Sequence, residues 1–178
     1  MGTIENLELG PCIVEFGASG ALVDLGFTKG GVTMSITTDT ADVTTDQFGT
    51  VIMKQILVGR NVQVVCPFAE TDLTKLSSFI PLTSVTTSGV FQKVLINTPV
   101  GADLVASASQ ILKITKSIGS ATSTDPNDAF KFFKAAATGA VEVNFSIEDQ
   151  RVWNVTFQAY PDSTQSFSLG VFGDENIA

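Results

Sequence analysis

The chain has 178 residues, of which 44% are hydrophobic and 16% charged, with a mean hydropathy of +0.30 and a formal net charge of −8. This length fits one domain around one core. The charged fraction is low against about 25% in an average soluble protein, so the surface must be rich in uncharged polar residues. With 18 acidic and 10 basic residues, the composition argues against a protein that grips nucleic acid through clustered Lys and Arg.

The N-terminal segment MGTIENLELG has no basic region followed by an apolar run, so we expect no secretory signal and no membrane insertion. Two cysteines, Cys12 and Cys66, are too few for a disulfide scaffold and lack the spacing of metal ligands. We expect free, buried thiols, and the sequence alone leaves a bridge between them open.

The first half of the chain has the pattern of β-strands. Apolar, β-rich runs at 11–17 and 22–27 are separated by turn residues. From residue 32, apolar and polar residues alternate with the period of two that is typical of a strand with one buried face. The apolar positions are Val32, Met34 and Ile36, and the polar positions are Thr33, Ser35, Thr37 and Asp39.

A turn is predicted at 46–49, because Gly49 can adopt a positive φ without steric cost. A return strand starts near Val51, and residues 59–61 indicate a bulge or a tight turn. Residues 31–68 are therefore predicted to form a long strand, a loop and one or two return strands. On the return, one face is expected to carry Ile56, Val58, Val62 and Val64, and the other Asn61 and Gln63.

A short helix is predicted at 71–80, where Leu73, Leu76 and Ile80 have helical spacing and Thr71 is the expected N-cap. Residues 83–127 are rich in Ser and Thr, with strand-like runs at 91–97 and 110–118 and a loop at 117–127. We assign no role to this segment and treat part of it as a loop insertion.

The last third returns to strands, at 129–136, 141–147 and 151–160, with a further edge strand at 169–174. The sequence thus predicts one mainly β domain over 1–178, an antiparallel β-sandwich or partial barrel with a long hairpin and one short flanking α-helix. The expected core comprises Val32, Met34, Ile36, Val62, Val64, Leu73, Leu76, Trp153, Val155 and Phe157.

The chain has no histidine, which removes Ser-His-Asp triads, Cys-His dyads and nearly all catalytic zinc sites. We therefore expect no enzyme, no cofactor and no metal site. Asp39, Asp42 and Asp46 do not have the spacing of a calcium loop, so solvated acids are the better interpretation. Trp153 and Phe157 could line a sugar site on a sandwich face, but core packing is favoured.

Several short runs resemble, in their order, the tail tube (major tail) proteins of tailed bacteriophages. They are LGFTKGGV at 25–32, DV at 42–43, DQFGT at 46–50, Gly59 and FAETDL at 68–73. The resemblance spans about residues 10 to 80 and extends more loosely from 151–153 to 172–174. The segment 83–123 matches nothing in this family.

The resemblance implies a virion structural protein: a β-sandwich that assembles into stacked hexameric rings, with one long hairpin from each subunit joining a barrel around a lumen. Double-stranded DNA would pass this lumen without specific binding. The expected location is the virion tail, assembled in the host cytoplasm, with tape-measure, tail terminator and baseplate proteins as further partners. A secretion-system tube protein and a carbohydrate-binding β-sandwich are the alternatives.

The resemblance also suggests roles for individual residues of the hairpin. The loop 45–53 would reach the neighbouring ring, with Phe48 as an apolar anchor. The lumen-facing candidates are Thr33, Ser35, Thr37, Asp39, Asn61 and Gln63, and the inter-ring candidates are Asp46, Gln47, Phe48, Gly49 and Thr50.

Overall fold

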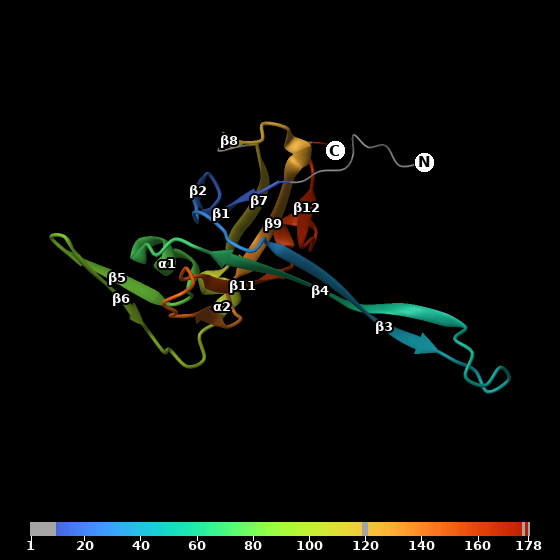
Figure 1. Cartoon of the computed structure of the whole chain (residues 1–178). Helices are drawn as coiled ribbons and strands as arrows, with labels where there is room; N and C mark the ends of the chain where they lie inside the picture. The colour runs from blue at the N-terminus through green and yellow to red at the C-terminus, as the bar shows by residue number, and fades with distance from the viewer. Residues whose placement is uncertain (1–9, 119–120, 176, 178) are drawn as a thin grey trace.

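The computed structural model describes residues 10–118, 121–175 and 177. Their strands form one large antiparallel sheet and a separate two-stranded hairpin (Figure 1). In chain order the elements are β1 Cys12–Ala18, β2 Ala21–Asp24, β3 Thr33–Val43, β4 Lys54–Phe68, α1 Leu73–Phe79, β5 Thr83–Ser88, β6 Phe91–Ile96, α2 Leu104–Ala108, β7 Gln110–Ile118, β8 Ala121–Thr122, β9 Ala129–Ala136, β10 Val141–Val143, β11 Trp153–Tyr160 and β12 Gly170–Phe172. Two 3-10 turns lie at Pro126–Asp128 and Ser163–Gln165.

The large sheet has the strand order β2-β1-β7-β9-β11-β4-β3. One edge of β9 pairs with β7, and its other edge pairs with β12 near its start and with β11 near its end. Strands β1 and β11 are not neighbours in this order, yet the rings of Phe16 and Phe157 lie 5.2 Å apart. The sheet therefore folds over on itself around a core. The fold is mainly β and sandwich-like, and its described strands do not close into a barrel.

Aromatic side chains fill the centre of this core. Phe157 of β11 contacts Phe16 of β1 and lies 6.4 Å from Phe79 of α1, measured between ring centroids. Phe79 in turn stacks on Phe68 of β4 at 5.5 Å. The predicted helix is thus present, and its buried residues Leu76 and Phe79 cover one opening of the folded sheet.

The start of α1 differs from the prediction. The helix begins at Leu73, and its N-cap is Asp72, whose carboxylate accepts a hydrogen bond of 2.8 Å from the Thr74 N–H. A carboxylate suits this position because it also interacts favourably with the helix dipole. The hydroxyl of Thr71, the expected cap, accepts instead from the Trp153 indole N–H at 3.3 Å.

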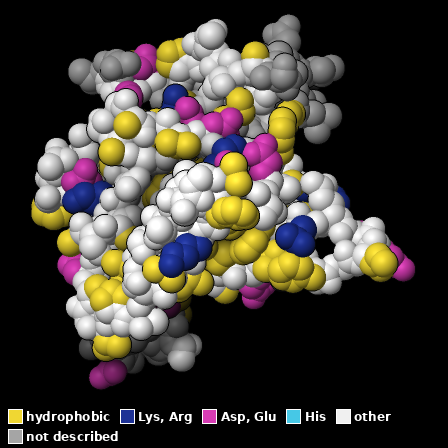
Figure 2. Space-filling model, turned by 90° about the vertical axis from the view of Figure 1, so that its left-hand side faces the viewer, with side chains coloured by type: hydrophobic (Ala, Val, Ile, Leu, Met, Phe, Trp, Pro, Cys, Tyr) yellow, Lys and Arg dark blue, Asp and Glu magenta, His cyan; other side chains and the backbone are white. Residues whose placement is uncertain are grey.

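Within the middle segment, the strand-like runs at 91–97 and 110–118 are confirmed as β6 and β7. The partner strand β5 and the short helix α2 were not predicted, and the expected loop at 117–127 contains β8 and a 3-10 turn. β5 and β6 form a hairpin that projects from the body on the side opposite the long β3–β4 hairpin (Figure 1). Figure 2 shows this side, where hydrophobic patches lie among mostly uncharged surface.

Most of the residues expected in the core are in contact with it. Val62, Val64, Leu76, Val155 and Phe157 are buried, and Val32, Met34 and Trp153 are partly buried against the core. Two residues require correction, since Ile36 is 46% exposed and Leu73 is 37% exposed. Ile36 lies where the β3–β4 hairpin leaves the body, and Leu73 occupies the first turn of α1. Strand β10 is also shorter than expected and ends at Val143.

Candidate assembly arm

The predicted hairpin over 31–68 is present as β3 and β4, which pair in antiparallel register from Thr33–Val65 to Val43–Lys54. Strand β11 pairs with β4 only from Gln63 to Phe68. Residues 36–62 form a two-stranded ribbon, here called the arm, which is anchored by the buried Val62 at its root and otherwise extends beyond the body (Figure 1). The arm owes its length to residues of strand character on both sides, which are Thr-rich in β3 and include Ile56, Val58 and Val62 in β4.

The arm exposes an unusual number of large apolar side chains. Those exposed by 40% to 69% are Ile36, Val43, Phe48, Val51, Ile52, Met53, Ile56, Leu57 and Val58. A two-stranded ribbon alone is at best marginally stable in water. Contiguous exposed apolar surface in a soluble protein commonly marks an interaction site. The arm is thus a candidate interaction surface.

A β-bulge divides the arm. The register shifts between Asp39 and Thr40, which face Gly59 and Leu57, so Val58 is the additional residue. The sequence indicated a bulge or turn at 59–61, and the structure places the bulge at Val58, directly before this range. The bulge also reverses the side-chain parity of the return strand. Leu57 consequently shares a face with Val62, whereas Ile56, expected beside Val62, lies on the opposite face.

Between Thr33 and Asp39 one face of the hairpin is polar and nearly uncharged, whereas beyond the bulge the same face carries Ala41, Val43 and Ile56. Directly opposed residues of an antiparallel pair lie on the same face, and Ser35 opposes Gln63 while Thr37 opposes Asn61. The six residues expected to face a lumen therefore share one face, and all are exposed: Thr33, Ser35, Thr37, Asp39, Asn61 and Gln63. We call this the polar face, and the face of Met34, Ile36, Val62 and Val64 the apolar face.

Strand β11 continues the polar face, which the sequence analysis did not recognise. The Gln63 side-chain amide donates to the Gln158 carbonyl oxygen at 3.2 Å, and the Gln158 amide donates to Asn61. Asn154 and Thr156 lie on the same side of β11 as Gln158. The strict alternation in 151–160 predicted that these side chains point outward. The sequence does not predict that β11 pairs with β4, and it is this pairing that places them beside the polar face of the arm.

The end of the arm, residues 45–53, is here called the tip. Its turn closes through hydrogen bonds from Phe48 N–H to the Thr45 carbonyl (3.1 Å) and from Val51 N–H to the Phe48 carbonyl (3.3 Å). Gly49 has φ 62°, the left-handed value that glycine tolerates best. The five inter-ring candidates, Asp46 to Thr50, are all exposed and lie farthest from the body (Figure 1).

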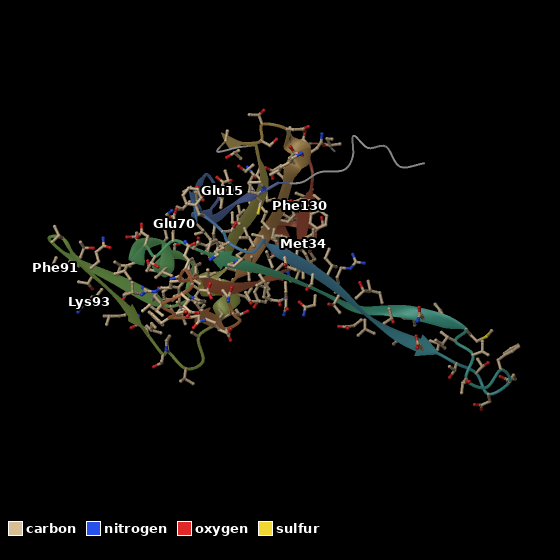
Figure 3. The ribbon with its side chains drawn as sticks, in the orientation of Figure 1. Glu15, Met34, Glu70, Phe91, Lys93 and Phe130 are labelled. Atoms are coloured by element: carbon tan, nitrogen blue, oxygen red, sulfur yellow. The ribbon has the colours of Figure 1, made fainter. Side chains whose placement is uncertain are left out.

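Both long edges of the arm are open. β3 is the last strand in the order of the large sheet, and β4 has β11 beside it only from Gln63 onward. Open strand edges present rows of backbone N–H and C=O groups that pair readily with another strand. Figure 3 shows the arm's side chains pointing to both sides of the ribbon, with Met34 at its root near Phe130.

The two thiols and the carboxylates are the remaining candidates for a chemical site. Cys12 and Cys66 are free, as expected, and burial raises the pKa of both thiols, most strongly for Cys66, so neither is an activated nucleophile. In the part of the chain that the structure describes, no cluster of three or more Cys, Asp or Glu side chains could hold a metal ion. None of the described helices is long and apolar enough to cross a membrane.

The fold and the arm define a class of protein: a mainly β body with a long, two-edged β-ribbon whose two faces differ in polarity from its root to the bulge. Comparison of the sequence with models of protein families and with curated proteins gives no match to either.

Proposed function

We propose that this chain is a structural subunit that assembles side by side and end to end into a tube, as the phage tail tube proteins it resembles do. In this proposal hexameric rings stack, the arms form a continuous barrel, and double-stranded DNA passes through its lumen during ejection from the virion. The observation that carries the proposal is the arm itself, which exposes apolar side chains and two open edges that a neighbour must cover.

The register of the arm suits a barrel made from several copies. β3 and β4 are antiparallel, so β3 of one copy placed beside β4 of the next continues the alternation around a ring. A barrel of about eight strands is filled by its own side chains, and an open channel needs more. A channel lined by two-stranded arms therefore needs more than about four copies.

The two faces have different roles in this proposal. The polar face points into the lumen, where hydroxyl and amide side chains such as Thr37, Asn61 and Gln63 stay hydrated. Its charged residues beyond the body are Asp39 and Lys54, of opposite sign. A wall with few cations holds a polyanion weakly, because phosphate binding depends on Lys and Arg. The apolar face points outward, toward the bodies of the ring.

A carbohydrate-binding function has little support. A sugar platform requires an exposed aromatic ring, whereas Trp153 is partly buried against the core and its indole N–H donates to Thr71. A tube protein of a secretion system would use the same arm in the same way. The identity of the genes next to the gene for this chain would distinguish such a tube from a phage tail.

Negative-stain electron microscopy of the purified protein tests the proposal. We expect rings or tubes of uniform width at high protein concentration. Monomers alone over a wide range of protein and salt concentrations would contradict the proposed function. Thermal unfolding of the same samples shows whether the protein is folded, so that a failure to assemble is not confused with a failure to fold.

A further inference from the structure

We propose that the arm tip of one copy docks into a groove at the root of the arm of another copy, and that this head-to-tail contact drives axial growth. The inference rests on the proposed function and deepens it by naming the surface that receives the tip. Two unmatched apolar surfaces of this chain, which lie at opposite ends of the same ribbon, carry the argument.

The groove lies between the apolar face of the arm and the segment around β12, with a volume of about 410 Å³. Ile36, Leu57, Arg60 and Val62 form its arm side. All four lie on the apolar face, and Leu57 is there because the bulge at Val58 reverses the parity of β4. The bulge thus decides which residue lines this wall, since in a regular strand Val58 rather than Leu57 would oppose Thr40 on this face.

The opposite wall is aromatic and is built under strain. Phe132 and Phe172 line it, together with Phe167 from the loop before β12. Ser166 and Phe167 have φ of 53° and 61°, the left-handed region that L-residues other than Gly, Asn and Asp rarely adopt. Phe167 is nevertheless 71% exposed, so its strained backbone places a large apolar ring in water.

Asp162 holds this strained loop in place. Its main-chain carbonyl accepts from the N–H groups of Gln165 at 3.0 Å and Phe167 at 2.8 Å, and its carboxylate accepts from the Thr164 N–H at 3.1 Å. Lys134 of β9 adds an ion pair to the same carboxylate at 3.3 Å. Backbone strain persists only where the surroundings determine it in this way, and it is typical of binding sites.

The tip has the properties that fit this groove. It presents four large apolar side chains, Phe48, Val51, Ile52 and Met53, all about half exposed. Its only charged residue is the acidic Asp46, and the only charged residue that lines the groove is the basic Arg60. The two surfaces therefore complement each other in apolar character and in charge.

The length of the arm requires the tip and the groove to come from different molecules. Ile36 lines the groove and the tip starts at residue 45, and a strand rises by about 3.3 Å per residue, so the two ends of the ribbon are roughly 30 Å apart. Because the contacting surfaces differ, each copy retains a free tip and a free groove. Such a heterologous contact propagates as an open filament or stack.

A mixing experiment tests the docking. The Phe48→Ser variant has a defective tip and an intact groove, and the Phe167→Ser variant has the reverse. We expect each alone to lose axial growth. When the two are mixed, the intact tip of one should bind the intact groove of the other, and growth should stop there. Sedimentation velocity with one variant labelled should show a species of about twice the mass that each forms alone.

A matched control is Phe145→Ser, which removes another exposed ring outside both the tip and the groove and should assemble like wild type. If the mixture contains no species larger than those of the separate variants, the inference is wrong. The same result is expected if the groove binds a different protein instead of the tip. Absence of tubes or rings from the wild type would instead overturn the proposed function, so the two failures are distinguishable.

A charge exchange gives a second, independent test with variants on exposed positions. Asp46→Lys and Arg60→Glu should each weaken axial association several-fold, because each places like charges together in the contact. The double variant should recover much of the wild-type association, measured as the protein concentration at which half the chains sediment as tubes. Recovery no better than either single variant would overturn the pairing of the tip with this groove.

Discussion

Phe157 is the residue on which the two halves of the folded sheet depend most directly. It is fully buried and contacts rings from both β1 and α1, so its removal leaves a cavity between three elements. We expect Phe157→Ala to lower the free energy of unfolding by about 3–5 kcal/mol. Denaturant unfolding of the protein under non-assembling conditions measures this change.

The matched control for this substitution is Phe91→Ala, since Phe91 lies exposed on the β5–β6 hairpin (Figure 3). It should change the free energy of unfolding by less than about 0.5 kcal/mol. Equal effects of the two substitutions would show that Phe157 does not hold the layers together as its contacts indicate.

Asp162 connects the stability of the groove loop to pH. The hydrogen bond from Thr164 N–H lowers the pKa of its carboxyl below the usual value, burial opposes this, and Lys134 adds to the lowering. A group with a depressed folded pKa stabilises the fold above its unfolded pKa and loses this contribution as pH falls through the folded value. The stabilisation should therefore be lost below about pH 4.

Thermal melts at pH 7, 4 and 2 test this expectation with Asp162→Asn, which keeps an acceptor oxygen but removes the charge. The melting temperature of the variant should be lower than that of the wild type at pH 7, and the difference should shrink toward pH 2. Lys134→Met should also reduce the pH dependence, since it removes the paired cation. A difference between wild type and Asp162→Asn that stays constant with pH would contradict the assignment.

At the scale of elements, the arm should be separable from the body. β4 is held by β11 only from Gln63 onward, so the body does not need the ribbon beyond Thr37 and Asn61. Replacing residues 38–60 with Asn-Gly links these opposed residues by a two-residue hairpin turn. We expect a folded protein whose melting temperature is within a few degrees of wild type and which forms no tubes.

Circular dichroism and negative-stain microscopy measure the two parts of that expectation. An unfolded variant would show that the arm stabilises the body. A folded variant that still forms tubes would show that assembly depends on another surface, of which the β5–β6 hairpin is the next candidate because it exposes Val90, Phe91 and Ile96.

The sequence predicts an element well where one physical signal dominates. The alternation at 151–160 marks β11, and that at 32–37 marks the start of β3, because one face of each segment packs on the core. The apolar spacing at 71–80 marks α1. α2 was missed because it has five residues and no buried side chain. β5 was missed because its Thr and Ser residues, which are mostly exposed, show no alternation.

The arm shows why a correct strand pattern can still misplace side chains. Ile36 continues the parity of Val32 and Met34, yet it is 46% exposed where the hairpin leaves the body, and no pattern in the sequence marks that point. The bulge at Val58 shifts the register by one residue, which moves Ile56 to the polar face and Leu57 to the groove. The groove also needs Phe132 and Phe167, which only the folded chain brings beside the arm.

At the scale of the whole assembly, the polar face should matter for DNA rather than for tube formation. Thr37→Lys and Asp39→Lys add cations to an exposed face that has no part in the core. If this face lines the lumen, every subunit contributes a lysine to a ring around the DNA. We expect tubes of normal width that retain double-stranded DNA, with an affinity that falls steeply as salt rises.

Thr86→Lys, on the β5–β6 hairpin, adds the same charge as Thr37→Lys to a different surface. If the β5–β6 hairpin lies on the outside of the tube, the lysine at position 86 should bind DNA there and leave ejection unaffected. The arm variants should instead reduce infectivity in a phage that carries them. The comparison separates the position of the charge from its presence, because all three variants change the net charge in the same direction. Unchanged infectivity and no DNA retained in the tubes of the arm variants would count against the lumen assignment and leave the polar face without a function.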